Sequence, residues 1–244
     1  MYSDAEKVVM PLMFFILLAI TVLLWLLLRN KSEKWQSIPF KIITLTLIVG
    51  EGIKQYLSIK EGYDFWNLPL HFCSTYFIWL SLAEFSVGKM QKTMRNIAFV
   101  ATIYLFVGLY TYPSGIFGDL CENVFETYFT VHSFFYHHLV ILYMLLSIAF
   151  KRFHPRKRDA FTWMACFSVY FVVALVCAYT FEENFFNILN SEPLPILEPV
   201  RLAVGQVVYN AGLGAVLIFA GSGVIVLSAV ISEKMRKKKE TDPQ

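Results

Sequence analysis

Charged residues are scarce in this sequence. They make up 16% of the 244 residues, whereas soluble domains contain about 25%. Hydrophobic residues reach 57%, and the mean hydropathy is +0.56. A composition this poor in charge excludes an ordinary soluble domain and indicates a multi-pass membrane protein. The basic residues flank apolar runs instead of lining a groove, which also excludes nucleic-acid binding.

Cysteine is equally sparse, and the usual spacings of metal sites are missing. The four cysteines are Cys73, Cys121, Cys166 and Cys177. Cys166 and Cys177 fall on one predicted helix, about 16 Å apart at 1.5 Å per residue, which is too far for a disulfide bond. The sequence has no His-x-x-x-His or Cys-x-x-Cys spacing, which argues against zinc. We expect no structural disulfide, no metal and no cofactor.

The first apolar run lacks the features of a cleaved signal peptide. The run from Val8 to Leu28 is about twice as long as a typical signal-peptide core. Asp4 and Glu6 precede it, where basic residues would be expected in a signal peptide. We therefore expect this run to form a first transmembrane helix.

Seven apolar runs have about the length needed to cross a bilayer, near 20 residues. They cover residues 8–28, 39–58, 68–88, 96–112, 128–150, 160–181 and 206–231. The third should begin at Asn67, a good N-cap, with Pro69 in its first turn. The last is rich in glycine, which favours close helix packing in lipid. The predicted fold is all-α: one transmembrane bundle of seven spans over residues 1–233, followed by a basic tail at 234–244.

The loops between these runs alternate in charge. Most of the 21 basic residues follow the first, third, fifth and seventh runs, which places them on one side of a seven-span bundle. The opposite loops carry acidic residues, including Asp119, Glu122, Glu126, Glu182 and Glu183. By the positive-inside rule, the N-terminus should lie outside and the C-terminus in the cytoplasm.

Several ionisable residues gather in the outer half of the predicted bundle, although such groups are costly to place in lipid. They are Glu51, Lys54, His71, Cys73, His132, His137 and His138. Structural interpretations stay open: Glu51 and Lys54, spaced i,i+3, can neutralise each other. His71 can lie at the membrane interface, and Cys73 can pack as a small apolar residue. Near the opposite end, Glu84 should snorkel or pair with a basic loop.

The sharper hypothesis is a nucleophilic Cys73 activated by a histidine. His71 is a poor base for it, because two residues along a helix turn the side chain by about 200°. The base should therefore come from the fifth run. The adjacent His137 and His138 point about 100° apart, so only one of them can face the interior well. Depth in the membrane, taken alone, favours His132.

The segment Leu68-Pro69-Leu70-His71-Phe72-Cys73 resembles the Leu-Pro-Leu-His-x-Cys motif of the YwaF-like integral membrane proteins of bacteria. Two further features are similar to that family: an aromatic pair shortly before His138, and an Asn-aromatic segment that begins at Asn184. Animal relatives of the family are multi-pass acyltransferases that remodel ether phospholipids. The resemblance implies Cys73 as nucleophile and acyl carrier, with His138 or His137 as base. It also implies the plasma membrane of a bacterium as the location.

Two functions from different classes follow. The first is a lipid acyltransferase or hydrolase, with membrane phospholipids as environment and substrate. The alternative is a transporter or a small-molecule or ion-binding protein, in which the polar cluster is a proton relay or an anion site. Binding roles are expected for Glu51, Lys54, His71, His132 and Asn184. The sequence does not indicate an oligomeric state.

Overall fold

The computed structural model describes residues 3–113, 116, 121, 123–191 and 197–241, and the regular structure in these ranges is helical. The long helices are α1 (Asp4–Leu28), α3 (Ile38–Lys60), α5 (Gly88–Thr111), α7 (Tyr128–Ala149), α8 (Asp159–Phe181) and α10 (Gln206–Thr241). The short helices are α2 (Glu33–Gln36), α4 (Tyr76–Phe85), α9 (Glu198–Val204), and the 3-10 turns η1 (Phe65–Asn67), η2 (Cys73–Thr75) and η4 (Phe185–Asn187). The all-α prediction is confirmed.

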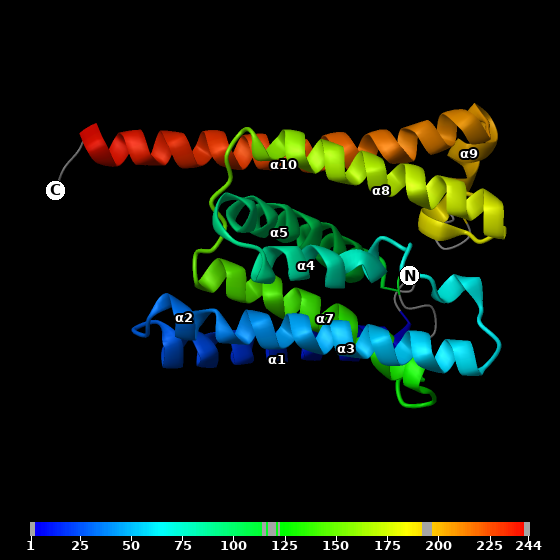
Figure 1. The fold of residues 1–244 in the computed structure, drawn as a ribbon, viewed down its shortest axis with the longest axis horizontal. Coiled ribbons are helices and arrows are strands. Elements are labelled where there is room, and N and C mark those ends of the chain that lie inside the picture. Colours follow the sequence, from blue (N-terminus) through cyan, green and yellow to red (C-terminus); the bar gives the residue numbers. More distant parts are fainter. Residues whose placement is uncertain (1–2, 114–115, 117–120, 122, 192–196, 242–244) are drawn as a thin grey trace.

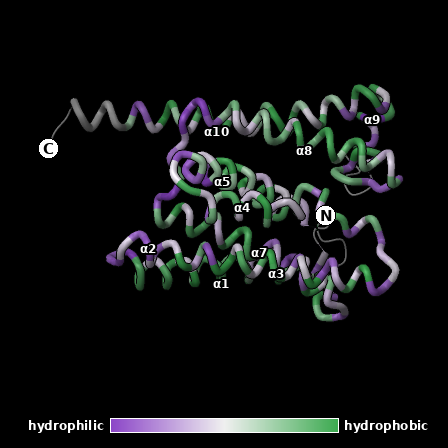
Figure 2. The backbone as a smooth tube through the Cα atoms, viewed as in Figure 1, coloured by the Kyte–Doolittle hydropathy of each residue, from purple (hydrophilic) through white to green (hydrophobic). Residues whose placement is uncertain are grey.

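Within the described ranges, six helices are long and apolar enough to cross a membrane. They are the long helices named above, which lie along the long axis of the molecule (Figure 1). Hydrophobic residues predominate along these helices, and hydrophilic residues are concentrated at the connections between them (Figure 2). Large apolar side chains such as Phe15, Val172 and Phe219 stay exposed on them, as expected of surfaces that face lipid. The multi-pass membrane architecture is therefore confirmed.

The third predicted span, 68–88, is not a continuous helix, and the prediction that a helix begins at Asn67 is wrong. Asn67 is the last residue of η1, and its side-chain amide donates to Ser58 Oγ at 3.1 Å. Leu68, which follows, has an extended backbone (φ −57°, ψ 139°), so no helix continues from Asn67. The chain turns through Pro69, and α4 begins only at Tyr76. With 10 residues, α4 is about 15 Å long, half the thickness of a bilayer core.

Close packing predicted for the glycine-rich last run is confirmed where α10 lies against α8. A Cβ atom on Gly221 would overlap the indole ring of Trp163. The Trp163 Nε1–H group donates to the carbonyl oxygen of Leu217 at 3.2 Å, and the hydroxyl of Tyr104 from α5 donates to the same oxygen at 3.3 Å. The absence of a side chain at Gly221 therefore lets three helices meet at one backbone carbonyl.

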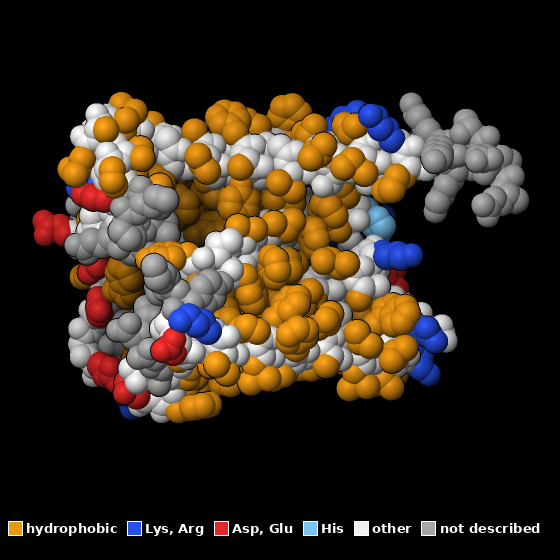
Figure 3. Space-filling view, turned by 180° about the vertical axis from the view of Figure 1, so that it is seen from behind, with side chains coloured by type: hydrophobic (Ala, Val, Ile, Leu, Met, Phe, Trp, Pro, Cys, Tyr) orange, Lys and Arg blue, Asp and Glu red, His pale blue; other side chains and the backbone are white. Residues whose placement is uncertain are grey.

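Charged side chains separate to the two ends of the bundle. Figure 3 shows Asp and Glu side chains at one end and mostly Lys and Arg at the other, with apolar side chains between them. The basic end contains the connections after α1, α4 and α7 and the C-terminal part of α10. The acidic end contains the connections after α3 and α8.

Candidate functional site

The segment from residue 67 to residue 75 is irregular, yet it lies among the long helices. Its carbonyl oxygens accept hydrogen bonds from side chains of three different helices. The donor and acceptor pairs are Gln55 to Asn67 at 2.6 Å, Tyr170 to Leu70 at 2.9 Å and Tyr136 to Ser74 at 3.1 Å. Irregular backbone is tolerated at membrane depth only where protein buries it or a wet cavity receives it. Side chains of α3, α7 and α8 therefore stabilise the irregular backbone that interrupts the third predicted span.

Tyr136 hydrogen-bonds to the backbone on both sides of the junction between η2 and α4. Its hydroxyl donates to Ser74 and accepts a hydrogen bond from the backbone N–H of Phe77 at 3.0 Å. At the start of α4, the buried Tyr76 donates to the carbonyl of Ala101 in α5 at 2.7 Å. Sequence reasoning missed these tyrosines as site residues. The available signal was a phenol in the middle of an apolar run, because a buried tyrosine hydroxyl needs a partner.

Cys73 is the first residue of η2, and its thiol is free and partly buried. Its electrostatic neighbours include the phenols of Tyr76, Tyr136 and Tyr170 and the ammonium group of Lys54. The expectation that His71 and Cys73 point apart assumed a regular helix, which is absent at these residues. Lys54, one of the predicted polar residues, is thus within electrostatic range of the candidate nucleophile.

Glu51 and Lys54 form a buried ion pair on α3, so their mutual neutralisation is confirmed. The Lys54 Nζ and Glu51 Oε1 atoms are 2.9 Å apart, and the two side chains are 11% and 5% exposed. Gln55 Nε2 also donates to Glu51 Oε1 at 2.8 Å, and Gln55 Oε1 accepts from the Tyr63 hydroxyl at 2.7 Å. A polar chain therefore leads from Tyr63, beyond the end of α3, to the buried pair.

His132 joins this cluster from α7. Its Nε2 atom lies 3.8 Å from Glu51 Oε2, and its side chain is 9% exposed. Gly50 makes the approach possible, because a Cβ atom there would lie 3.1 Å from the imidazole Cδ2 atom. Tyr128 donates to the carbonyl of Gly50 at 2.8 Å. The predicted binding residues Glu51, Lys54 and His132 are thus assembled between α3 and α7.

His137 and His138 are both buried on α7, so the expectation that only one of them faces the interior is wrong. The same kind of hydrogen bond orients both side chains. The Nδ1 atom of His137 lies 2.6 Å from the Ser133 carbonyl oxygen, and that of His138 lies 2.7 Å from the Phe134 carbonyl oxygen. A carbonyl oxygen can only accept, so these contacts assign the proton to Nδ1 and leave Nε2 as the basic nitrogen. His137 interacts electrostatically with His132 and Lys54, whereas the His138 ring lies 4.3 Å from the Phe134 ring.

The other two predicted site residues lie at the acidic end. The His71 ring lies 4.1 Å from the Trp66 ring and 5.3 Å from the Phe185 ring. Asn184 stabilises the turn that follows it, because its side-chain oxygen accepts hydrogen bonds from the N–H groups of Leu189 and Asn190 at 2.9 and 3.1 Å. Among the described residues, no three His, Cys, Asp or Glu side chains are grouped to hold a metal ion.

The geometry above belongs to a chain whose sequence matches one family model, that of the TMEM164 family, over residues 1–226. The chain belongs to the TMEM164 family. The matched range contains every candidate site residue and ends within α10. Comparison with curated proteins and with solved structures gives no match. Family membership supports an integral membrane protein; fold and family do not by themselves define a reaction.

One further charged pair of this TMEM164-family chain lies outside the membrane-spanning helices, on α9. Glu198 Oε2 accepts from Arg201 Nε at 2.9 Å and also from the Ser191 hydroxyl. These hydrogen bonds, that of Arg201 foremost, lower the pKa of Glu198 from 4.5 to about 2. Through Glu198, the side chain of Ser191 is joined to α9 at the acidic end.

Proposed function

We propose that this chain is an intramembrane acyltransferase or lipid hydrolase in which Cys73 carries the acyl group. One observation supports the proposal above the others. The free thiol lies in the irregular segment of residues 67–75, which hydrogen bonds from three helices hold inside the bundle. A protein that needed only a span at this position would be served by a continuous helix. Irregular backbone held in this way is typical of functional sites in membranes.

The proposed reaction has two acyl-transfer steps. The imidazole Nε2 atom of an α7 histidine removes the proton from Cys73, and the thiolate attacks the ester carbonyl carbon of a phospholipid. The C–S bond forms, the ester C–O bond breaks, and the departing lysolipid oxygen takes the proton from the imidazolium. A second lysolipid hydroxyl, or water, then gives its proton to the same nitrogen and attacks the thioester. The C–S bond breaks, and Cys73 recovers its proton.

Two features favour His137 as the base over His138, the residue that the family resemblance suggests. Lys54 interacts electrostatically with both Cys73 and His137. The side chain of His138 leaves α7 about 100° away, beside the ring of Phe134.

The proposal includes an orientation. With the basic end in the cytoplasm, the N-terminus lies outside, and Cys73 lies in the outer half of the bilayer. The segment 68–85 then completes a seventh crossing, because α4 is antiparallel to both α3 and α5 (Figure 1). A location in the plasma membrane of a bacterium remains a prediction from the resemblance alone.

The Glu51, Lys54 and His132 cluster favours the second candidate function, a transporter or ion-binding protein. Alternating access would require the bundle to open at its basic end. There Glu84, with a fully buried side chain, accepts hydrogen bonds from Tyr143 at 2.8 Å and Arg152 at 2.9 Å. Separating a buried charge from its partner costs about 3–5 kcal/mol. This closed end favours the enzyme over the transporter.

The test of the proposed function uses the full chain in phosphatidylcholine vesicles with a labelled ether lysolipid as acceptor. Turnover should fall by more than about a thousandfold in Cys73→Ser, because a nucleophile is irreplaceable in covalent catalysis. The matched control is Cys166→Ser on α8, which should keep wild-type turnover. His137→Gln should lose about a hundredfold or more, the usual contribution of a general base. Proton or solute flux that is lost in Glu51→Gln but kept in Cys73→Ser would overturn the enzyme proposal and support the transporter.

A further inference from the structure

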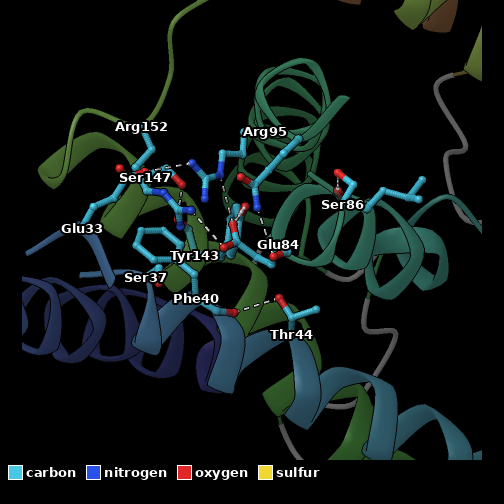
Figure 4. A network of polar contacts seen from close by, with 12 residues as sticks. Glu33, Ser37, Phe40, Thr44, Glu84, Ser86, Arg95, Tyr143, Ser147 and Arg152 are labelled. Atoms are coloured by element: carbon cyan, nitrogen blue, oxygen red, sulfur yellow. Dashed lines mark hydrogen bonds and ion pairs between the residues drawn. The ribbon is translucent and has the colours of Figure 1, made fainter. Parts of the chain in front are cut away.

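A second polar cluster lies at the basic end of the bundle (Figure 4). It centres on the buried carboxylate of Glu84 on α4. Arg152, which follows α7, is 2.9 Å from Glu84 Oε2, and the Nε atom of Arg95 on α5 is 3.9 Å from Glu84 Oε1. The Arg152 guanidinium also lies 3.8 Å above the ring of Phe40 on α3. The cluster therefore joins four helical segments where they end.

Charges in this cluster do not balance. Arginine stays protonated in proteins, so two guanidinium groups share the single buried carboxylate of Glu84. The remaining carboxylate nearby is Glu33 on α2, whose Oε1 atom is 3.7 Å from Arg95 Nη1. The Glu33 side chain is 88% exposed, whereas that of Arg95 is 15% exposed. A carboxylate so fully hydrated interacts weakly with its partner, so the cluster keeps a surplus positive charge at Arg95.

Hydrogen-bond donors in the cluster are also in surplus. Arg95 Nε and Arg152 Nη1 are buried and have no hydrogen-bond partner among the described residues. Buried N–H groups are nearly always paired. Planar guanidinium groups match the oxygens of a phosphate, which accept two parallel hydrogen bonds. The shortage of acceptors and the surplus charge thus point to the same kind of ligand, an anion with several oxygens.

The surroundings of the cluster match a lipid better than a free ion. The exposed Lys34, Lys89 and Lys92 lie on the segments next to it. Exposed apolar side chains lie on the same segments: Trp35 is 57% exposed and Val87 is 82% exposed. Tryptophan at the end of a span is typical of the headgroup region. Basic pockets between helix ends on the cytoplasmic side bind phosphate headgroups.

We propose that Arg95, supported by Arg152, binds the phosphate of an anionic phospholipid in the leaflet at the basic end, and that this phosphate displaces Glu33. The site is separate from Cys73 and does not depend on the proposed reaction. Its structural consequence is a bound lipid phosphate that pairs with Arg95 on α5 and Arg152 after α7 in place of Glu33.

The test is a titration of the purified, delipidated full chain with phosphatidylglycerol, followed by native mass spectrometry and by the thermal unfolding midpoint. Phosphatidylcholine and inorganic phosphate are titrated in parallel. We expect phosphatidylglycerol to bind and raise the midpoint, phosphatidylcholine to bind at least about tenfold more weakly, and inorganic phosphate to have no effect at equal concentration. Equal effects of inorganic phosphate would show a free-anion site and overturn the lipid assignment.

Three variants test the assignment to Arg95. Arg95→Gln should weaken phosphatidylglycerol binding by about tenfold or more, equivalent to 1.4 kcal/mol. Glu33→Gln should strengthen phosphatidylglycerol binding, because the Glu33 carboxylate competes with the phosphate for Arg95. The Glu33 side chain is so exposed that this substitution should not impair folding. Lys157→Gln removes a positive charge at the same end, where Lys157 pairs with Glu233 at 3.0 Å, and should leave binding unchanged. Binding that is insensitive to Glu33→Gln, or equally reduced by Lys157→Gln, would overturn the proposal.

Discussion

The hydroxyl oxygen of Tyr136 and the carbonyl oxygen of Ser74 lie 3.1 Å apart, joined by a hydrogen bond between α7 and η2. The same hydroxyl accepts from the N–H of Phe77. Cys73 precedes Ser74, so one side chain of α7 sets the backbone of the residue next to the candidate nucleophile. The irregular segment and the histidines of α7 are thereby held by the same helix.

Removing the hydroxyl of Tyr136 should loosen this segment. Tyr136→Phe leaves the carbonyl of Ser74 and the N–H of Phe77 without their partner, which should lower the free energy of unfolding by about 1–3 kcal/mol. It should also reduce acyl transfer, because the position of Cys73 is no longer fixed. Unfolding in detergent and turnover in vesicles measure the two effects.

Tyr104→Phe is the matched control for that variant. It removes a single longer hydrogen bond, 3.3 Å to the carbonyl of Leu217 on α10, and keeps the ring, which lies 5.8 Å from that of Phe72. A small loss of stability with full turnover is expected. Equal turnover losses in both variants would mean that Tyr136 has no special relation to the site.

Glycine at position 221 should be required for the contact between α8 and α10. Gly221→Ala places a methyl group inside the indole ring of Trp163, and such overpacking typically costs about 1–3 kcal/mol. Gly223→Ala, two residues away with nothing within 4 Å of an added Cβ atom, should be neutral or slightly stabilising, because alanine favours helix. Thermal unfolding of the two variants in the same detergent compares them directly. Equal midpoints would contradict the close approach.

The carboxylate of Glu84 should contribute more to stability than any exposed acidic residue at the basic end. Glu84→Gln keeps an acceptor for the Tyr143 hydroxyl but leaves the buried Arg152 without its counter-charge. We expect a loss of about 3–5 kcal/mol. Glu233→Gln, which breaks the exposed pair with Lys157, should cost less than about 1 kcal/mol. Denaturant titration would refute the prediction if both variants unfold alike.

Acidification should loosen the connection between α8 and α10. The folded-state pKa of Glu198, about 2, lies below its ordinary value of 4.5. A lowered pKa stabilises the folded form above the ordinary value, and this contribution is lost as the pH falls from about 4.5 to about 2. Hydrogen exchange of residues 198–204, corrected for its intrinsic pH dependence, should rise through this window. In Glu198→Gln, protection should be weaker throughout and should no longer change with pH; an unchanged profile would reject the assignment.

Features encoded in local sequence were predictable, and features that depend on distant partners were not. Apolar length alone gave the six long helices, and i,i+3 spacing gave the pair of Glu51 and Lys54. The expected pairing of Glu84 with a basic loop is confirmed by Arg152.

The helix start at Asn67 failed because capping preferences describe a segment in isolation. Here Gln55 on α3 donates to the carbonyl of Asn67, and Tyr170, 100 residues further along the chain, supplies the partner for the carbonyl of Leu70. Nothing within the motif indicates these contacts. The same holds for Arg95, whose relation to Glu84 and Glu33 depends on how α2, α4 and α5 end together.

The central claim is that Cys73 becomes acylated. Mass spectrometry of the intact protein tests it. After brief incubation with a phospholipid that carries a mass-tagged acyl chain, the account predicts one added acyl group. It should be located at Cys73 by peptide mapping, be released by neutral hydroxylamine, and be absent in Cys73→Ser but present in Cys166→Ser. An unmodified Cys73 in protein that turns the lipid over, or equal labelling of Cys166, would contradict it.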